Sequence, residues 1–169
     1  MTIHTTYFAA LDHDLVEPDD DHLVAGVVRR PADWTRDLVD RNIQSVAPPE
    51  DLLDAVKTVE EAADSDDDID DPRRVAWSST DFAVRYQSHL LSARLDRVLG
   101  QLRTDEREQG AVWLVCYEKD PAFCHRRLLA DELARGRTDD PVHHPEPDSS
   151  IETETTAHAS LSDFDGGQA

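Results

Sequence analysis

Residues 113–127 read WLVCYEKDPAFCHRR and contain the clearest structural boundary in the sequence. The continuous apolar run 111–116 predicts a buried, central strand of a parallel sheet. The segment that follows Pro121 predicts a helix over residues 123–135, with Gly136 as its terminator. Reactive or charged side chains gather at this junction, namely Cys116, Glu118, Cys124, His125 and Arg126. Because ligands of open α/β sheets bind beyond the carboxyl ends of strands, the stretch predicts a site here.

The preceding sequence predicts the rest of an α/β domain. Two runs rich in apolar or β-branched residues predict strands at 3–10 and 23–28. Apolar residues at helical spacing predict helices at 32–42, 50–63 and 79–104. A short extended piece is expected at 75–77, and Ser78 is expected to cap the helix that follows it. We therefore expect a small three-layer α/β domain with a short, mostly parallel sheet flanked by helices.

The domain is expected to span residues 1–137, with an exposed acidic loop at 64–71. Residues 138–169 are dominated by acidic, small polar and proline residues, which predicts a disordered acidic tail. The amino terminus has no pattern of a secretory signal. No apolar run approaches the ~20 residues of a membrane span. We expect a cytoplasmic protein that has no membrane partner and whose two cysteines are free thiols.

The charge composition is strongly acidic, with 37 Asp and Glu residues and a net charge of −20. Of the 17 basic residues, 15 are arginine, and the two lysines are Lys57 and Lys119. Acidity combined with scarce lysine is typical of proteins from concentrated salt, such as those of a haloarchaeon, where the Debye length falls to ~3 Å. The alternative is an acidic protein of an ordinary cytoplasm. Either way, nonspecific nucleic-acid binding is not expected, because it needs a basic footprint.

The junction also carries a family resemblance. The pattern of Cys116, Glu118, Lys119 and Pro121, followed by Cys124-His125-Arg126, resembles the signature of the domain-of-unknown-function 488 family. An earlier family element, an Asp-Val-Arg strand end followed by proline, matches in part at residues 27–31, where Arg29 fits and the aspartate is missing. The resemblance covers residues 1–137. It implies a small α/β fold and a site, because the family has no settled activity.

A reactive thiol is the first chemical hypothesis for this site. A cysteine at a helix start experiences the helix dipole, which lowers the pKa of the thiol and favours a thiolate. Cys124 is therefore a candidate nucleophile or sulfur carrier, with His125 beside it and Glu118 as a candidate general acid or base. The alternatives are a Cys124 that packs as a small apolar residue, and a Glu118 that pairs with Arg126 or Arg127. Packing is the favoured role for Cys116.

An anion site is the second hypothesis. Arg126 at the helix start, Arg29 at the end of residues 23–28, and Lys119 could bind a phosphate or carboxylate. The alternative is that these cations neutralise the acidic surface. Cys116, Cys124 and His125 also offer three metal ligands, with His143 or His144 as a fourth, but no paired ligand spacing is present, so no metal is predicted.

The sequence thus predicts a cytoplasmic protein that binds an anionic small molecule or nucleotide, with a thiol-dependent reaction as one interpretation. The alternative is a noncatalytic module that binds a ligand or partner and has structural cysteines. Thiol reactivity distinguishes the two. The sequence identifies neither a cofactor nor an oligomeric state.

Overall fold

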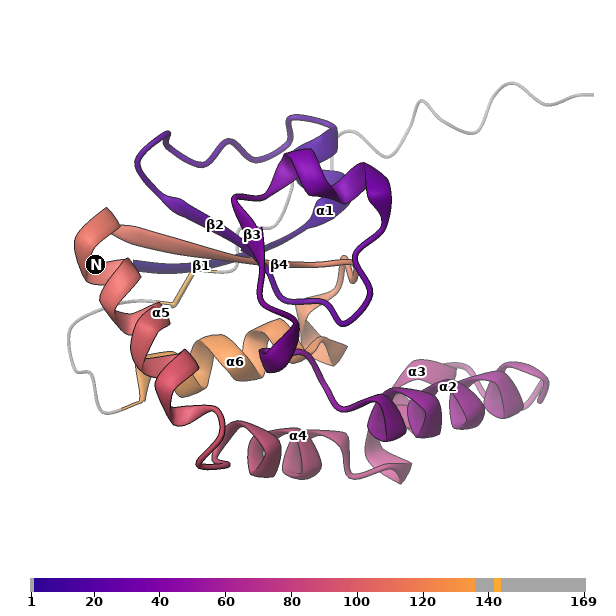
Figure 1. Ribbon diagram of the computed structural model, residues 1–169. Helices are drawn as coiled ribbons and strands as arrows, with labels where there is room; N and C mark the ends of the chain where they lie inside the picture. The colour runs from indigo at the N-terminus through magenta and orange to yellow at the C-terminus, as the bar shows by residue number, and fades with distance from the viewer. Residues whose placement is uncertain (1, 136–141, 144–169) are drawn as a thin grey trace, which may run out of the picture.

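A five-stranded parallel sheet organises the computed structural model, which describes residues 2–135 and 142–143 (Figure 1). The strands follow the order β3-β2-β4-β1-β5 across the sheet. Their bounds are β1 (Thr2–Tyr7), β2 (Leu23–Gly26), β3 (Arg41–Asn42), β4 (Ala111–Cys116) and β5 (Val142–His143). All paired strands run parallel, so their carboxyl ends lie at the same edge of the sheet.

Strand β4 occupies the centre of the sheet, and all six of its residues are buried. It pairs with β1, where Tyr7 lies beside Cys116, and with β2, where Gly26 lies beside Val115. The strands predicted within residues 23–28 and 111–116 are therefore both present, and they are parallel neighbours. The loop after β2 therefore begins next to Cys116.

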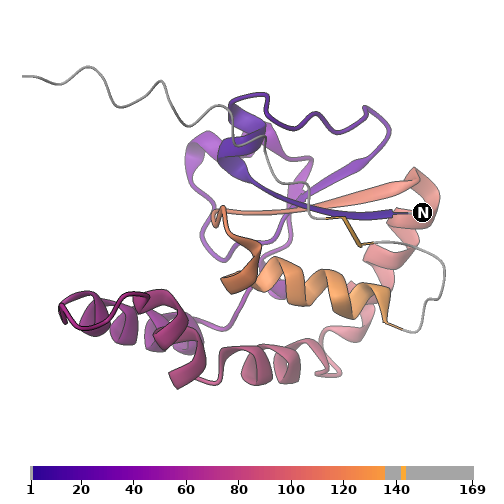
Figure 2. The ribbon, with the colours of Figure 1, turned by 180° about the vertical axis from the view of Figure 1, so that it is seen from behind.

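Helices cover both faces of the sheet, which confirms the predicted three-layer α/β class (Figures 1 and 2). One face carries α1 (Phe8–Asp12) and the 3-10 helix η1 (Asp33–Leu38). The other carries α5 (Asp96–Gln109) and α6 (His125–Ala134), with α4 (Phe82–Leu90) packed against α6. The pair α2 (Glu50–Asp64) and α3 (Pro72–Ser79) lies side by side and projects past the sheet. Two further 3-10 helices, η2 (Gln44–Val46) and η3 (Pro121–Phe123), precede α2 and α6.

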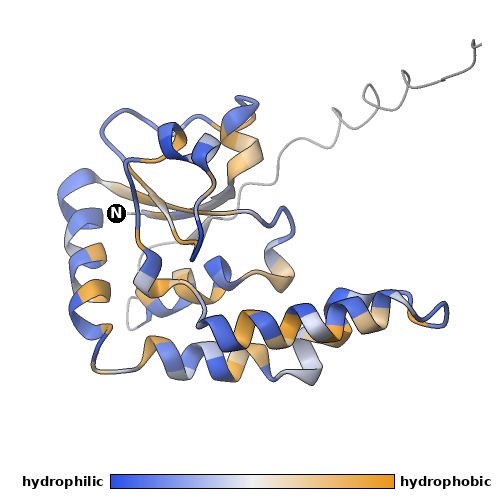
Figure 3. Ribbon diagram, turned by 45° about the vertical axis from the view of Figure 1, so that its right-hand side comes forward, coloured by the Kyte–Doolittle hydropathy of each residue, from blue (hydrophilic) through white to orange (hydrophobic). Residues whose placement is uncertain are grey.

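The core lies between the sheet and the helices, and the hydrophobic colours in Figure 3 concentrate on the strands and on one side of the helices. Tyr86 of α4 is fully buried there, and its hydroxyl donates to the Val46 carbonyl at 2.7 Å. Arg41 of β3 pairs with the buried carboxylate of Asp105 in α5. These polar contacts fix α4 and α5 relative to the segments beside β2.

Two elements predicted before residue 43 have a different secondary structure from the one expected. The strand expected at 3–10 ends at Tyr7, because Phe8 and Leu11 turn their side chains into the core from the short helix α1. The helix expected at 32–42 is instead η1 followed by β3. There the backbone and side chain of Asp40 both bond to Val24, which draws the chain into the sheet.

The region from 71 to 104 also differs from the prediction. Residues 75–77 are helical, because the Asp71 side chain caps α3 by accepting from the Arg74 amide at 2.9 Å. Ser78 lies inside that helix and donates to the Arg74 carbonyl, so it is not a cap. The long helix expected at 79–104 is divided into α4 and α5 by a turn at 91–95.

The acidic segment 65–71 forms the predicted loop between α2 and α3. Most of the predicted tail, 138–169, lies outside the described residues. Within it, residues 142–143 form the edge strand β5 beside β1. Among the described residues, no helix is both long and apolar enough to span a bilayer.

Candidate functional site

The candidate site forms where β4 ends and α6 begins. Cys116 is the last residue of β4, and Cys124 is the residue that precedes the first turn of α6. Between them, Pro121 opens η3, and the Asp120 carboxylate caps η3 by accepting from the Ala122 amide at 2.8 Å. This local capping turns the chain back, so that Cys124 returns to the end of β4.

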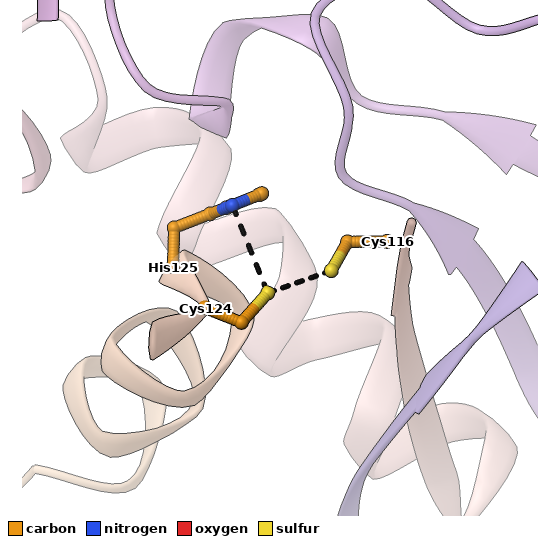
Figure 4. Close-up of side chains that lie close together, drawn as sticks. All are labelled: Cys116, Cys124 and His125. Atoms are coloured by element: carbon orange, nitrogen blue, oxygen red, sulfur yellow. Dashed lines mark hydrogen bonds between the residues drawn. The ribbon is translucent and has the colours of Figure 1, made fainter. Parts of the chain in front are cut away.

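The two sulfur atoms lie in direct contact. Cys116 Sγ and Cys124 Sγ are 2.7 Å apart, and Cys124 Sγ is 4.0 Å from His125 Nδ1 (Figure 4). Each cysteine is 1% exposed. This separation is shorter than an ordinary non-bonded contact between two thiols and longer than the ~2.05 Å of a disulfide bond.

A buried arginine accompanies the sulfur pair. Arg126 is 2% exposed, and its Nη1 donates to Cys116 Sγ at 3.1 Å and lies 3.5 Å from Cys124 Sγ. The same guanidinium donates to the backbone carbonyls of Glu118 and Lys119, the latter at 2.8 Å. Within the described residues, no carboxylate forms an ion pair with it. A buried cation needs a compensating anion, and the sulfurs are its nearest candidates.

The protonation of the pair follows from these contacts. Burial raises the pKa of the Cys116 thiol, but the hydrogen bond from Cys124 and the charge of Arg126 outweigh burial and lower the pKa below its ordinary value. Burial raises the pKa of Cys124 well above its ordinary value, and the bond to Cys116 raises it further. These opposite directions favour Cys116 over Cys124 as the site of any thiolate in the pair.

The expected lowering of the Cys124 pKa by the helix start is therefore wrong. The dipole acts on an exposed anion with a modest free energy, whereas this thiol is buried and bonded to Cys116, and both effects raise its pKa.

His125 is held as a neutral imidazole. Its Nε2 lies 2.7 Å from the Val27 carbonyl, an acceptor, so Nε2 carries the proton and Nδ1 keeps its lone pair toward Cys124. Burial lowers the pKa of His125 to about 4, against the opposing effect of the Val27 bond and with a smaller contribution from the Arg126 charge. The edge-to-face contact with Tyr86, 5.6 Å between ring centroids, fixes the ring plane.

A cavity of about 320 Å³ opens beside the sulfur pair. Cys116 and His125 line it, whereas Cys124 and Arg126 lie behind Cys116 and do not. The remaining walls are Val28, Arg29, Arg30, Pro48, Glu50, Leu53, Asp54, Lys57, Tyr117 and Glu118. The cavity thus joins the carboxyl ends of β2 and β4 to the first turns of α2.

The other predicted site residues divide between the cavity and its surroundings. Arg29 lines the cavity, and its guanidinium donates to the carbonyls of Pro48 at 2.7 Å and Ala47 at 3.2 Å. Glu118 also lines it and forms an ion pair with Arg73 of α3. Burial opposes the charge of Arg73, yet the hydrogen bond with Glu118 raises its pKa. Lys119 is exposed and is not among the residues that line the cavity.

Sequence reasoning missed several residues that shape the cavity. Tyr117 accepts from the Ala32 amide at 2.7 Å and donates to the Arg30 carbonyl at 3.0 Å, so it holds the loop after β2. Asn42 bonds the amide and carbonyl of Val28 with its side chain, at 3.2 and 2.9 Å. The sequence signal for Tyr117 was its position, as an aromatic residue, directly after Cys116. The sequence held no signal for Asn42, because its contact with Val28 depends on strand pairing.

The three groups of Cys116, Cys124 and His125 offer ligand atoms within 4.8 Å of one another, so a metal is a chemical alternative. Two thiolates on one tetrahedral zinc lie about 3.7 Å apart, since each Zn–S bond is ~2.3 Å. The observed sulfurs are 2.7 Å apart and face the Arg126 cation. The S–S separation is thus shorter than that of two zinc-bound thiolates.

Comparison with known protein families gives a match to this chain. The family described as the active DUF488-N3 subclade matches residues 9–137, a range that runs from α1 past the end of α6 and includes both cysteines. No curated protein and no solved structure shows significant similarity to the chain. The matched range covers most of the sequence and coincides with the domain that builds the site. The chain therefore belongs to the DUF488 family.

Proposed function

We propose that this protein is a thiol-dependent enzyme that binds a small anionic ligand in the cavity beside Cys116. The observation that carries the proposal is the buried Arg126, whose positive charge faces two sulfurs next to the cavity and favours a thiolate on Cys116. The description of the matched subclade as active supports a catalytic interpretation.

The charge balance of the site supports a thiolate. An unpaired buried charge costs several kcal/mol in effective terms, and removal of one member of a buried ion pair costs about 3–5 kcal/mol. Arg126 would bear such a cost if both thiols were neutral. A thiolate on Cys116 provides the counter-charge at 3.1 Å.

The roles of the site residues follow from their positions. Cys116 would attack an electrophilic atom of the ligand, because it is the cysteine among the residues that line the cavity. Cys124 holds the proton next to it, and the neutral His125 offers an acceptor at Nδ1 for that proton. Arg126 would position and stabilise the thiolate rather than contact the ligand.

The ligand class is inferred from the lining. Arg29, Arg30 and Lys57 supply positive charge to the lining, although Arg30 pairs with Glu50 and Lys57 pairs with Glu61. Arg29 donates to two uncharged carbonyls, and the lining carboxylate of Glu118 is paired with Arg73. A cavity of about 320 Å³ suits a small molecule or part of a nucleotide. We therefore propose a phosphate- or carboxylate-bearing ligand, and a reducing compartment such as the cytoplasm, where thiols persist.

Alkylation kinetics test this proposal. Iodoacetamide should modify Cys116 in the folded protein, and a Cys116→Ser variant should remove the fast reaction while Cys124→Ser keeps it. Phosphate or sulfate, added at constant ionic strength, should slow the reaction by occupying the cavity. If neither cysteine reacts until the protein unfolds, the second candidate gains support.

That second candidate is a noncatalytic ligand- or partner-binding module with structural cysteines. The observation in its favour is the 1% exposure of both thiols. It predicts that Cys116→Ser lowers stability without changing ligand binding.

A further inference from the structure

We propose that Cys116 and Cys124 form a reversible disulfide within one chain, so that the site alternates between a dithiol and an oxidised state. The inference shares the Cys116 thiolate with the proposed function. It needs neither the anionic ligand nor a catalytic step.

The positions of the sulfurs support bond formation. A disulfide has an S–S length of ~2.05 Å, so the observed 2.7 Å leaves roughly 0.7 Å to close. The two residues belong to different elements, the end of β4 and the start of α6, joined by residues 117–123. Each of these linking residues is exposed or partly exposed. Small adjustments of this linker can bring the sulfurs together without disturbing the core.

The chemistry is that of a thiolate and a resolving thiol, with a hydroperoxide as the oxidant. The Cys116 thiolate attacks one peroxide oxygen, an S–O bond forms, the O–O bond breaks, and hydroxide or alkoxide leaves and takes a proton from water. The Cys124 sulfur then attacks the sulfenic acid on Cys116. The S–S bond forms, the S–O bond breaks, and water leaves with the Cys124 proton. The dithiol loses two electrons, and the hydroperoxide gains them.

Oxidation would change the charge around Arg126. The disulfide removes the negative charge that faces Nη1, so the guanidinium keeps the carbonyls of Glu118 and Lys119 as its acceptors. Cys116 also ceases to be a nucleophile. The oxidised state should therefore lose thiol reactivity at the cavity, while the disulfide ties the start of α6 covalently to the end of β4.

The experiment has an unambiguous product, because the chain contains two cysteines and any disulfide within one chain must join them. The full chain is reduced, freed of reductant, treated with a few equivalents of hydrogen peroxide, and analysed by intact mass and thiol titration. We expect loss of both titratable thiols and of the mass of two hydrogen atoms, with full recovery after dithiothreitol. Cys124→Ser should instead stop at a sulfenic acid on Cys116 that a dione probe traps.

Three results would overturn the inference. These are disulfides mainly between chains, direct conversion of Cys116 to sulfinic acid while Cys124 stays reduced, and one equivalent of tightly bound zinc that both Cys→Ser variants lose. The outcomes also separate this inference from the proposed function. Rapid alkylation of Cys116 without a disulfide refutes the inference alone, whereas a disulfide without any protection by anions refutes the proposed ligand.

Discussion

Replacement of Arg126 by methionine tests the electrostatic basis of the site most directly. Methionine keeps much of the side-chain volume and removes the charge. Cys116 Sγ then loses its donor at 3.1 Å, and the Lys119 carbonyl loses its donor at 2.8 Å. The pKa of Cys116 should rise, because the positive charge that opposes the effect of burial is gone.

The magnitude follows from the contacts. A hydrogen bond to a charged group contributes about 1.5–3 kcal/mol, which corresponds to a factor of about ten to a hundred in the thiolate population. Alkylation of Cys116 near neutral pH should therefore slow by about tenfold to a hundredfold. Unfolding free energy should fall by about 2–5 kcal/mol, because the Glu118 and Lys119 carbonyls lose their partners.

The assay uses a Cys124→Ser background, in which serine still offers a hydroxyl donor and Cys116 is the one remaining thiol. Alkylation rates are measured against pH, with circular dichroism at each pH to confirm folding. Arg127→Met is the matched control, because Arg127 Nη2 donates to the Ala122 carbonyl at 3.3 Å and contacts neither sulfur. Equal rates in the two arginine variants, or an unchanged profile in Arg126→Met, would refute the thiolate assignment.

Three further predictions concern stability. Gly26→Ala should lower the free energy of unfolding by about 1–3 kcal/mol, because its new Cβ would lie 2.8 Å from Asn42 Oδ1. Gly100→Ala has open space around its new Cβ and should leave the stability unchanged or raise it. Similar denaturation midpoints for the two variants would contradict this reasoning. The neutral His125 should contribute at most about 3 kcal/mol to the free energy of unfolding. This contribution is complete above pH ~6.5 and is lost as the pH falls toward 4, because the unfolded chain binds a proton at a higher pH than the folded protein does. Urea titrations across this range should show a loss in the wild type that His125→Gln lacks. Lowering KCl from molar to ~0.1 M should lower the denaturation midpoint, because repulsion among the 37 carboxyl groups is less screened; a midpoint that does not change with salt would count against a salt-adapted chain.

The sequence predicted the centre of the fold well because its signals there are local and mutually consistent. The continuous apolar run gave β4, and the apolar stripe of residues 50–63 gave α2 with a shift of one residue at its end. The single helix expected at 79–104 failed for a specific reason. Its apolar spacing continues across the break, and no glycine or proline marks the turn at 91–95. The turn is set by tertiary packing, which buries both Leu90 and Leu95.

The sequence identified which residues gather at the site better than it identified the role of each residue. The motif placed two cysteines, a histidine and an arginine at one junction, and the structure brings these four together. Which of them faces the cavity depends on where α6 begins, since one residue turns a helical side chain by about 100°. The helix begins at His125 rather than Phe123, so Arg126 points inward at the sulfurs. The pairing of Glu118 with Arg73 joins segments 45 positions apart and has no local signal.

The thiolate proposed for Cys116 is also compatible with the strongly acidic surface of this chain. Exposed carboxylates interact through solvent, so salt at molar concentration screens them over ~3 Å. The Cys116–Arg126 contact, at 3.1 Å, is about as long as that screening length, but both groups are buried and in direct contact, so no salt solution lies between them. Its electrostatic free energy should therefore depend little on salt, even where the stability of the whole domain depends on it. A nucleophile held by one buried cation can keep its protonation state across salt concentrations that reorganise the surface charge. An exposed carboxylate in the same role could not, because its pKa would follow the screening of its many acidic neighbours.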